Sequence, residues 1–202
     1  MPRRTLRPGF SLVELLVVLG VLVVLIGLLM PALSRARANA DRIGCRGHLH
    51  DLGAAFQMYL NESKQRLPRV NAMPSLRPLL NEYPAVTEVL APYLGNTRGV
   101  FGCRRDRITQ RADGAADDFD TYFDREGSSF QYSPELSSLS GGKPLSKARG
   151  FARRGASRLE VMYDYEPFHG APGAGGSRSY LFSDGHVGDR EDDTEIRDVL
   201  IH

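Results

Sequence analysis

The stretch RPGFSLVELLVVLGVLVVLIGLLMPALS, residues 7 to 34, decides the fold of this chain. From Leu15 to Ser34 it contains 20 consecutive residues without a charge, and most of them are Leu, Val or Ile. A helix of this length can cross the hydrocarbon core of a membrane, which is roughly 30 Å thick. We therefore expect residues 10–34 to form a transmembrane helix.

One acid, Glu14, lies inside the apolar start of this stretch, between Val13 and Leu15. An ionised carboxylate at that depth costs several kcal/mol unless it has a partner, so an acid in this position marks a function. The sequence Gly9-Phe10-Ser11-Leu12-Val13-Glu14, after a short basic leader, resembles the processing signal of type IV prepilins and type II secretion pseudopilins. This resemblance implies cleavage after Gly9 by a prepilin peptidase and N-methylation of Phe10.

The resemblance also implies the missing partner. In that family the acid at the position of Glu14 pairs with the N-terminal amine of a neighbouring subunit during assembly. Physically, an ammonium and a carboxylate that meet only between two subunits are each desolvated alone and neutralised together, so the pair favours association. The implied function is that of a structural filament subunit, not an enzyme, assembled with other pilin or pseudopilin subunits on an inner-membrane platform.

Two other interpretations of the apolar stretch remain open. An ordinary signal anchor would keep its leader and let Glu14 reach the membrane interface. A conventional secretory signal peptide would be cleaved near Ala38-Asn39-Ala40, although the apolar run exceeds the usual 7 to 15 residues of such signals. The alternative function is a single-pass, membrane-anchored extracytoplasmic binding or metal-binding protein that does not polymerise.

Length and charge limit the remaining classes. At 202 residues, the natural expectation is one domain plus an anchor. The leader, residues 1–9, holds three arginines and no acid, so the formal net charge of +2 becomes −1 without it. No strongly basic body remains, and we expect no nucleic-acid partner. Because arginines flank the apolar run on both sides, only the prepilin resemblance places the N-terminus in the cytoplasm and the head in the periplasm.

The only two cysteines, Cys45 and Cys103, would then lie outside the cytoplasm, where a disulfide persists. Their spacing leaves a disulfide and two buried thiols open as alternatives. A metal site built on the two cysteines is disfavoured, because neither has a second cysteine or a close histidine at zinc-ligand spacing.

The helical pattern continues beyond the membrane. Cys45, Leu49, Leu52, Phe56 and Tyr59 recur at intervals of four and three residues, which places them on one helix face. Residues 35–65 are therefore predicted to be an amphipathic continuation, in a helix about 75 Å long at 1.5 Å per residue. Glycines in this part, among them Gly53, leave room for another backbone to approach.

Residues 66–202 are predicted to form a globular α+β head, so the fold class is a long N-terminal helix packed on a small antiparallel sheet. Residues 85–94 are expected to form helical turns and 100–103 a brief strand or turn. Strands are expected at 128–132 and 158–166, the latter with alternating Leu159, Val161, Tyr163 and Tyr165. Residues 137–147 are expected to be a loop, and 194–200 a short closing helix.

A C-terminal box, Phe182-Ser183-Asp184-Gly185-His186-Val187, contains a dipeptide suited to a tight hairpin turn. The box resembles that of one group of pilin-like proteins with the pattern Phe-x-Asp-Gly-His-Val. This chain differs from the group in carrying Arg104 after the cysteine, His48 at a position that is usually Asn, and a glycine-rich insertion between His169 and Asp184.

Four side chains are the candidate metal ligands: Asp164, His169, Asp184 and His186. They converge if strand 159–166 pairs with 180–183, and a divalent cation such as Ca²⁺ is then the expected cofactor, although histidine is a poor calcium ligand. In the competing interpretation, Asp184 stabilises the turn and His186 either faces solvent or packs against its neighbours. The acidic set Asp117, Asp118, Asp120 and Asp124 lacks the glycine and final glutamate of an EF-hand loop, so we interpret it as a solvated loop.

An enzyme is not expected. Ser183, Asp184 and His186 are too close on one hairpin to align as nucleophile, base and orienting group, and the Gly-x-Ser-x-Gly elbow does not occur in the sequence.

Overall fold

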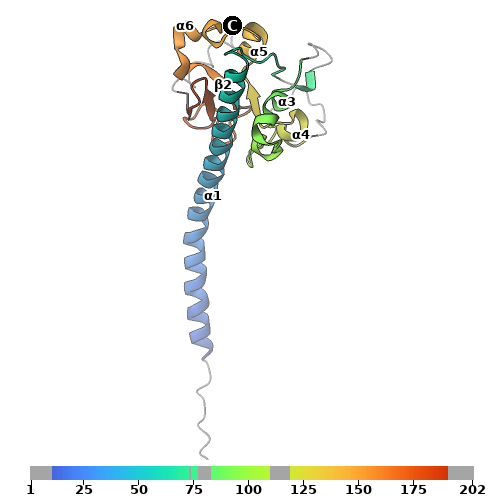
Figure 1. The fold of residues 1–202 in the computed structure, drawn as a ribbon. Helices are drawn as coiled ribbons and strands as arrows, with labels where there is room; N and C mark the ends of the chain where they lie inside the picture. Colours follow the sequence, from blue (N-terminus) through green and yellow to red (C-terminus); the bar gives the residue numbers. More distant parts are fainter. Residues whose placement is uncertain (1–10, 73, 77–82, 110–118, 191–202) are drawn as a thin grey trace, which may run out of the picture. The chain divides into compact units, whose positions relative to one another are not determined.

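The structure is a computed structural model of the chain, and it describes residues 11–72, 74–76, 83–109 and 119–190. The chain divides into two compact units, Met1–Ala40 and Asp41–His202, which we call the N-terminal unit and the head. Their boundary falls inside one long helix, labelled α1 in Figure 1. The head therefore includes the second half of α1.

Helix α1 spans Leu12–Glu62 and continues through Pro31. In the N-terminal unit, the large apolar side chains from Leu12 to Leu33 are between 47% and 78% exposed. This is the one helix in the described part of the chain that is long and apolar enough to cross a membrane. The apolar N-terminal helix that the sequence predicts is thus present, and its length and composition fit a membrane anchor or a signal sequence alike.

In the head, α1 presents one apolar face to the core. The four-and-three spacing predicts this face, and the prediction is confirmed: Tyr59 packs partly buried against the core, and the other four residues are buried. The buried residues of α1 are Cys45, Leu49, Leu52, Gly53, Ala55, Phe56 and Leu60.

At Gly53, α1 lies close to β3 (Tyr180–Phe182) and the turn that follows it. A Cβ atom at this position would lie 2.7 Å from Leu181 Cδ1 and 3.3 Å from the Gly185 carbonyl oxygen. A Cβ at Gly44 or Gly47 would meet nothing within 4 Å. Close approach therefore requires glycine at position 53 and not at the other two.

The sheet has four antiparallel strands in the order β1-β2-β3-β4. Their bounds are Phe130–Tyr132, Glu160–Asp164, Tyr180–Phe182 and Val187–Gly188. The predicted pairing of the strand at 159–166 with 180–183 is confirmed by the register Glu160↔Phe182 and Tyr163↔Tyr180. The fold is thus α+β, a long helix with a small antiparallel sheet.

Strand β2 differs from the alternation expected for it. Met162 and Asp164 are buried, although the pattern assigned them to the polar face, and Tyr163 is only half-buried. The register with β3 shifts between Glu160 and Met162. Val161, Met162 and Asp164 are each 0% exposed, so β2 lacks the solvated face that the alternating pattern assumes.

Short helices connect these elements, and Figure 1 labels the α-helical ones. They are η1 (Pro74–Leu76), α3 (Val86–Leu90), η2 (Ala91–Leu94), η3 (Arg98–Phe101), α4 (Tyr122–Glu126), α5 (Pro134–Ser140), η5 (Leu145–Lys147), α6 (Phe151–Arg154) and η6 (Ala156–Arg158). The helical turns expected at 85–94 are α3 and η2.

Two expectations for the connecting segments are wrong in part. The loop expected at 137–147 begins with the end of α5 and ends in η5, because Pro134 suits the first turn of a helix and Leu136 is fully buried. Of the strand or turn expected at 100–103, Val100 and Phe101 are the end of η3; Gly102 follows it in extended backbone, and neither Gly102 nor Cys103 belongs to a strand. The closing helix expected at 194–200, Asp117 and Asp118 lie outside the described residues.

Candidate functional site

The proposed processing residues, Gly9 and Phe10, lie outside the described residues, and Glu14 lies in the first turn of α1. Its Oε2 accepts a hydrogen bond of 2.9 Å from the Ser11 backbone N–H, and the Ser11 carbonyl accepts one from Leu15 N–H at 3.2 Å. A carboxylate here satisfies an N–H group at the helix start and lies at the positive end of the helix dipole. The Ser-x-x-Glu spacing could have predicted this contact from sequence.

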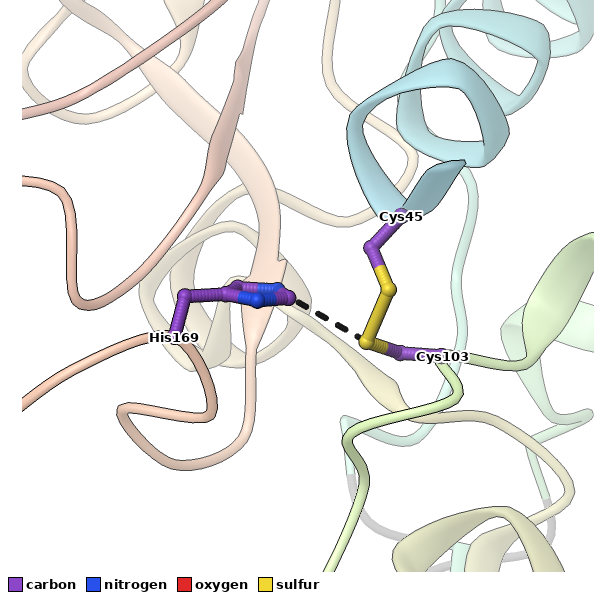
Figure 2. A group of neighbouring side chains, drawn as sticks. All are labelled: Cys45, Cys103 and His169. Atoms are coloured by element: carbon purple, nitrogen blue, oxygen red, sulfur yellow. Dashed lines mark hydrogen bonds between the residues drawn. A yellow bond between two sulfur atoms is a disulfide. The ribbon is translucent and has the colours of Figure 1, made fainter. Parts of the chain in front are cut away.

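Cys45 and Cys103 form a disulfide across 58 residues of sequence. Of the alternatives that the sequence left open, the structure therefore has the disulfide. Cys45 comes from α1 and Cys103 from the segment after η3, so the bond ties the covered half of α1 to the rest of the head (Figure 2).

His169 lies directly beside this disulfide, on the loop that follows β2 (Figure 2). Its Nε2 is 3.6 Å from Cys103 Sγ and 3.7 Å from Asp164 Oδ2. The His169 side chain is 1% exposed and that of Asp164 is 0% exposed. The sequence disfavoured a metal site on the two cysteines because neither has a close histidine at ligand spacing along the chain. The fold instead brings in a histidine that is 66 residues away from Cys103.

Burial sets the protonation of this pair. Burial, reinforced by the nearby cations Arg42 and Arg105, lowers the pKa of His169 to about 4. Burial also raises the pKa of Asp164 to about 7, although the Ser179 backbone N–H, at 2.7 Å from Oδ2, opposes the shift. His169 is therefore neutral at pH 7, and its contact with Asp164 is not an ion pair between two charged groups.

The four-residue metal set is not formed. Antiparallel pairing places Asp164 beside Ser179 at one end of β2, whereas Leu159 at the other end accepts a hydrogen bond from Ser183, next to Asp184. Five residues of strand separate the two ends by roughly 16 Å. The prediction that Asp164, His169, Asp184 and His186 share one divalent cation is therefore wrong. Because β3 runs antiparallel to β2, Asp164 lies beside the start of β3, whereas Asp184 follows the end of β3.

Asp184 and His186 instead pair with each other in the β3–β4 hairpin. Asp184 Oδ1 accepts a hydrogen bond of 3.2 Å from the His186 backbone N–H and lies 2.6 Å from His186 Nδ1. Partial burial alone would raise the pKa of Asp184, but these contacts with His186 outweigh it and lower the pKa. The His186 ring stacks on Phe182 at 4.3 Å between centroids, and Gly185 takes a positive φ of 93° in the turn.

The C-terminal box packs on α1. Gln57 donates a hydrogen bond of 2.8 Å to the Ser183 carbonyl, one helical turn beyond the close contact of Gly53 with Gly185. The polar residues of the box therefore hold a turn and a helix contact, which is the turn-stabilising interpretation that competed with the metal site.

A buried acid that sequence reasoning missed organises the segment around Cys103. Asp106 accepts hydrogen bonds from the backbone N–H groups of Tyr122 and Phe123 at 3.0 and 2.8 Å, and from Ser129 Oγ at 2.7 Å. Ser129 Oγ in turn accepts a hydrogen bond of 2.8 Å from Cys103 N–H. Burial raises the pKa of Asp106 against these donors. The network fixes the backbone that carries Cys103.

Two arginines of α1 bind the far end of the described chain. Arg42 lies 2.9 Å from Asp189 Oδ1, and Arg46 binds the same oxygen. Local sequence carries no signal for these pairs, because 147 and 143 residues separate the partners. With the disulfide, they attach α1 to the head at residues 42, 45 and 46.

A cavity of about 240 Å³ lies beside the loop after β2. Its lining residues are Arg104, Arg105, Arg107, Thr109, Glu166, Pro167 and Phe168. Glu166 accepts hydrogen bonds from Thr109 N–H at 3.1 Å and from Tyr122 O–H at 2.7 Å. Its carboxylate thus connects the loop after β2 with Thr109 and with α4.

The chemistry available in the described residues is thus concentrated at Cys45, Cys103 and His169, whose ligand atoms all lie within 4.8 Å of one another. The chain matches no protein-family model, no curated protein and no solved structure.

Proposed function

We propose that this chain is a structural subunit of a type IV pilus-like or type II secretion pseudopilus filament. In this proposal a prepilin peptidase cleaves after Gly9, Phe10 becomes the N-methylated terminus, and the processed subunits join on an inner-membrane platform. Before processing the N-terminus is cytoplasmic, and the head is periplasmic. The proposal assigns the chain no catalytic step.

The observation that carries the proposal is the uncovered apolar half of α1. Its 17 large apolar side chains, from Leu12 to Leu33, are all about half exposed or more. Removing these side chains from water is favourable by a free energy on the order of 20 kcal/mol, at the usual value for burying an aliphatic side chain. Lipid supplies this cover before assembly, and neighbouring helices supply it in a filament.

Glu14 makes a helix bundle more favourable than a single helix in lipid. Within the described part of the chain, its carboxylate accepts the hydrogen bond of 2.9 Å from the Ser11 backbone N–H at the start of α1. After cleavage, the positively charged terminus at Phe10 needs a counter-ion at the same depth in the membrane. A neighbouring Glu14 provides it, and each desolvated charge then has a partner.

Small residues on the same helix favour close packing of neighbours. Gly20 and Gly27 are seven residues apart and therefore near one face, and a Cβ at either position would meet nothing within 4 Å. Glycines at such positions let helix backbones approach in a membrane. The Cys45–Cys103 disulfide agrees with a head outside the cytoplasm, because disulfides persist there.

The test is the mass of the N-terminal peptide of the chain purified from its native host. We expect a chain that begins at Phe10 and carries one added methyl group. Gly9→Leu should leave the leader in place, and the control Gly44→Ala, in the exposed helix surface, should be processed normally. An intact Met1 in the parent would support the membrane-anchored protein that does not polymerise, and a start near Asp41 would indicate a secretory signal peptide; either result contradicts the proposal.

A further inference from the structure

The cluster of Cys45, Cys103 and His169 offers three donor atoms of the kinds that zinc prefers in proteins: two sulfurs and an imidazole nitrogen. Figure 2 shows that they come from three different segments: α1, the stretch after η3 and the loop after β2. In the oxidised protein the two sulfurs are bonded to each other, so they hold no metal.

The distances already approach those of a tetrahedral zinc site. Zn–S bonds of about 2.3 Å and Zn–N bonds of about 2.0 Å place a sulfur and a nitrogen ligand about 3.6 Å apart. Cys103 Sγ and His169 Nε2 are 3.6 Å apart. Two sulfur ligands need a separation of about 3.8 Å. Breaking the disulfide bond releases the sulfurs to move apart by this amount, because unbonded sulfur atoms cannot stay closer.

The surroundings leave polar atoms without partners. Within the described part of the chain, His169 Nδ1 and Asp164 Oδ1 are buried and have no hydrogen-bond partner. His169 Nε2 has only the long contacts with sulfur and carboxylate described above. Buried polar groups normally have partners, and those that lack them indicate a missing ion, water or functional contact.

We propose that reduction of the Cys45–Cys103 disulfide converts this cluster into a zinc-binding site. Cys45 Sγ, Cys103 Sγ and His169 Nε2 are the protein ligands, and the fourth position, beside the Asp164 carboxylate, takes a water molecule. This site is independent of filament assembly and does not require the proposed function.

A dithiol reductant supplies two electrons and two protons, which break the Sγ–Sγ bond and give two thiols, while the dithiol becomes a disulfide. Each thiol then loses its proton to solvent as it binds Zn²⁺, and the two thiolate charges balance the charge of the ion. The disulfide joins α1 to the segment that carries Cys103, whereas the metal would also bind the loop that carries His169.

Metal binding is measured on the full chain in detergent, with Co²⁺ as the spectroscopic probe and Zn²⁺ as the competitor. After reduction by a phosphine without oxygen, we expect one Co²⁺ per chain, with a thiolate-to-metal charge-transfer band that one equivalent of Zn²⁺ removes. The oxidised chain should show no such band. Zn²⁺ should also protect both thiols of the reduced chain from alkylation, which mass spectrometry counts.

The matched variants are His169→Gln and, as the control, His186→Gln on the exposed hairpin. Since each retains both cysteines, oxidised samples of both should keep the disulfide and the circular dichroism of the parent. We expect His169→Gln to weaken binding by at least about tenfold, since even indirect disturbance of a zinc site costs that much. His186→Gln should bind as the parent does.

A reduced parent without the charge-transfer band overturns the proposal, and so does a His169→Gln variant that binds Co²⁺ as tightly as the parent. If reduction unfolds the head, Zn²⁺ should refold the parent and not His169→Gln. A reduced head that unfolds and stays unfolded when Zn²⁺ is added likewise contradicts the site.

Discussion

The two halves of α1 have the same backbone and opposite surroundings. From Leu12 to Leu33 every large apolar side chain is exposed by 47% or more. In the head, Leu49, Leu52 and Leu60 on the same helix are 0% exposed. The first half has no cover within the described chain, whereas the second half is covered by the protein itself.

The difference shows where each half finds its stability. The second half carries its apolar residues on one face, which the sheet and its hairpin cover. This face is therefore part of the hydrophobic core of the head. The first half is apolar all round, so one face cannot bury it, and its length and composition fit a membrane anchor or a signal sequence. Substitutions in the two halves should therefore act on different properties of the protein.

The largest stability effect is expected from the disulfide that attaches the covered half of α1 to the rest of the head. Cys45→Ala combined with Cys103→Ala opens a loop of 58 residues, and the chain-entropy model gives a loss of about 4 kcal/mol in the free energy of unfolding of the head. Chemical denaturation in detergent with a metal chelator, followed by near-ultraviolet circular dichroism, measures this loss.

The control for that experiment is the parent chain, reduced under the same conditions with the chelator present. It should match the double variant, because the described residues contain no further cysteine. A double variant that unfolds at the same denaturant concentration as the oxidised parent would show that the covered half needs no cross-link.

The next largest change in stability is expected when one leucine in each half of α1 is replaced by alanine and the two variants are compared. Leu52→Ala removes a fully buried side chain and should lower the free energy of unfolding of the head by about 3 kcal/mol. Leu22→Ala, at a site that is 47% exposed, should change it by less than about 0.5 kcal/mol. The same denaturation assay compares them, and equal effects of the two substitutions would remove the distinction between the halves.

Replacing two glycines of α1 by alanine should give smaller changes in the free energy of unfolding, with opposite signs. Gly47→Ala, on the exposed face of α1, should raise the free energy of unfolding by up to about 1 kcal/mol, because alanine favours a helix. Gly53→Ala should lower it by about 1 kcal/mol, since its Cβ meets the fully buried Leu181 and the backbone of Gly185. If Gly53→Ala proves stabilising, α1 and the hairpin are not in close contact.

Local patterns in the sequence predicted the elements that are determined locally. The uncharged run, the four-and-three spacing from Cys45 to Phe56 and the Asp184-Gly185 turn each depend on residues within a few positions of one another. They therefore gave the long helix, its buried face and the β3–β4 hairpin. Because α5 has a single fully buried leucine, Leu136, and serines around it, its composition resembled that of a loop.

The candidate site could not be predicted in this way. The contact between Cys103 and His169 depends on three segments meeting in space, and the separation of Asp164 from Asp184 depends on the direction of β3. The spacing of these residues along the chain encodes neither the register of the sheet nor the burial of the loop that carries His169. The sequence therefore grouped four polar residues that the fold separates into two pairs, Asp164 with His169 and Asp184 with His186.

The most direct test of the account compares filament assembly by the variants Glu14→Gln and Asp51→Asn in the native host. Both substitutions replace an acid of α1 by its amide, but Asp51 is an exposed residue of the head, with 59% of its side chain accessible. Electron microscopy and the yield of sedimented subunits should show a loss of at least about tenfold for Glu14→Gln, the effect of about 1.4 kcal/mol per contact, and none for Asp51→Asn. Filaments of Glu14→Gln as abundant as those of the parent would contradict the account.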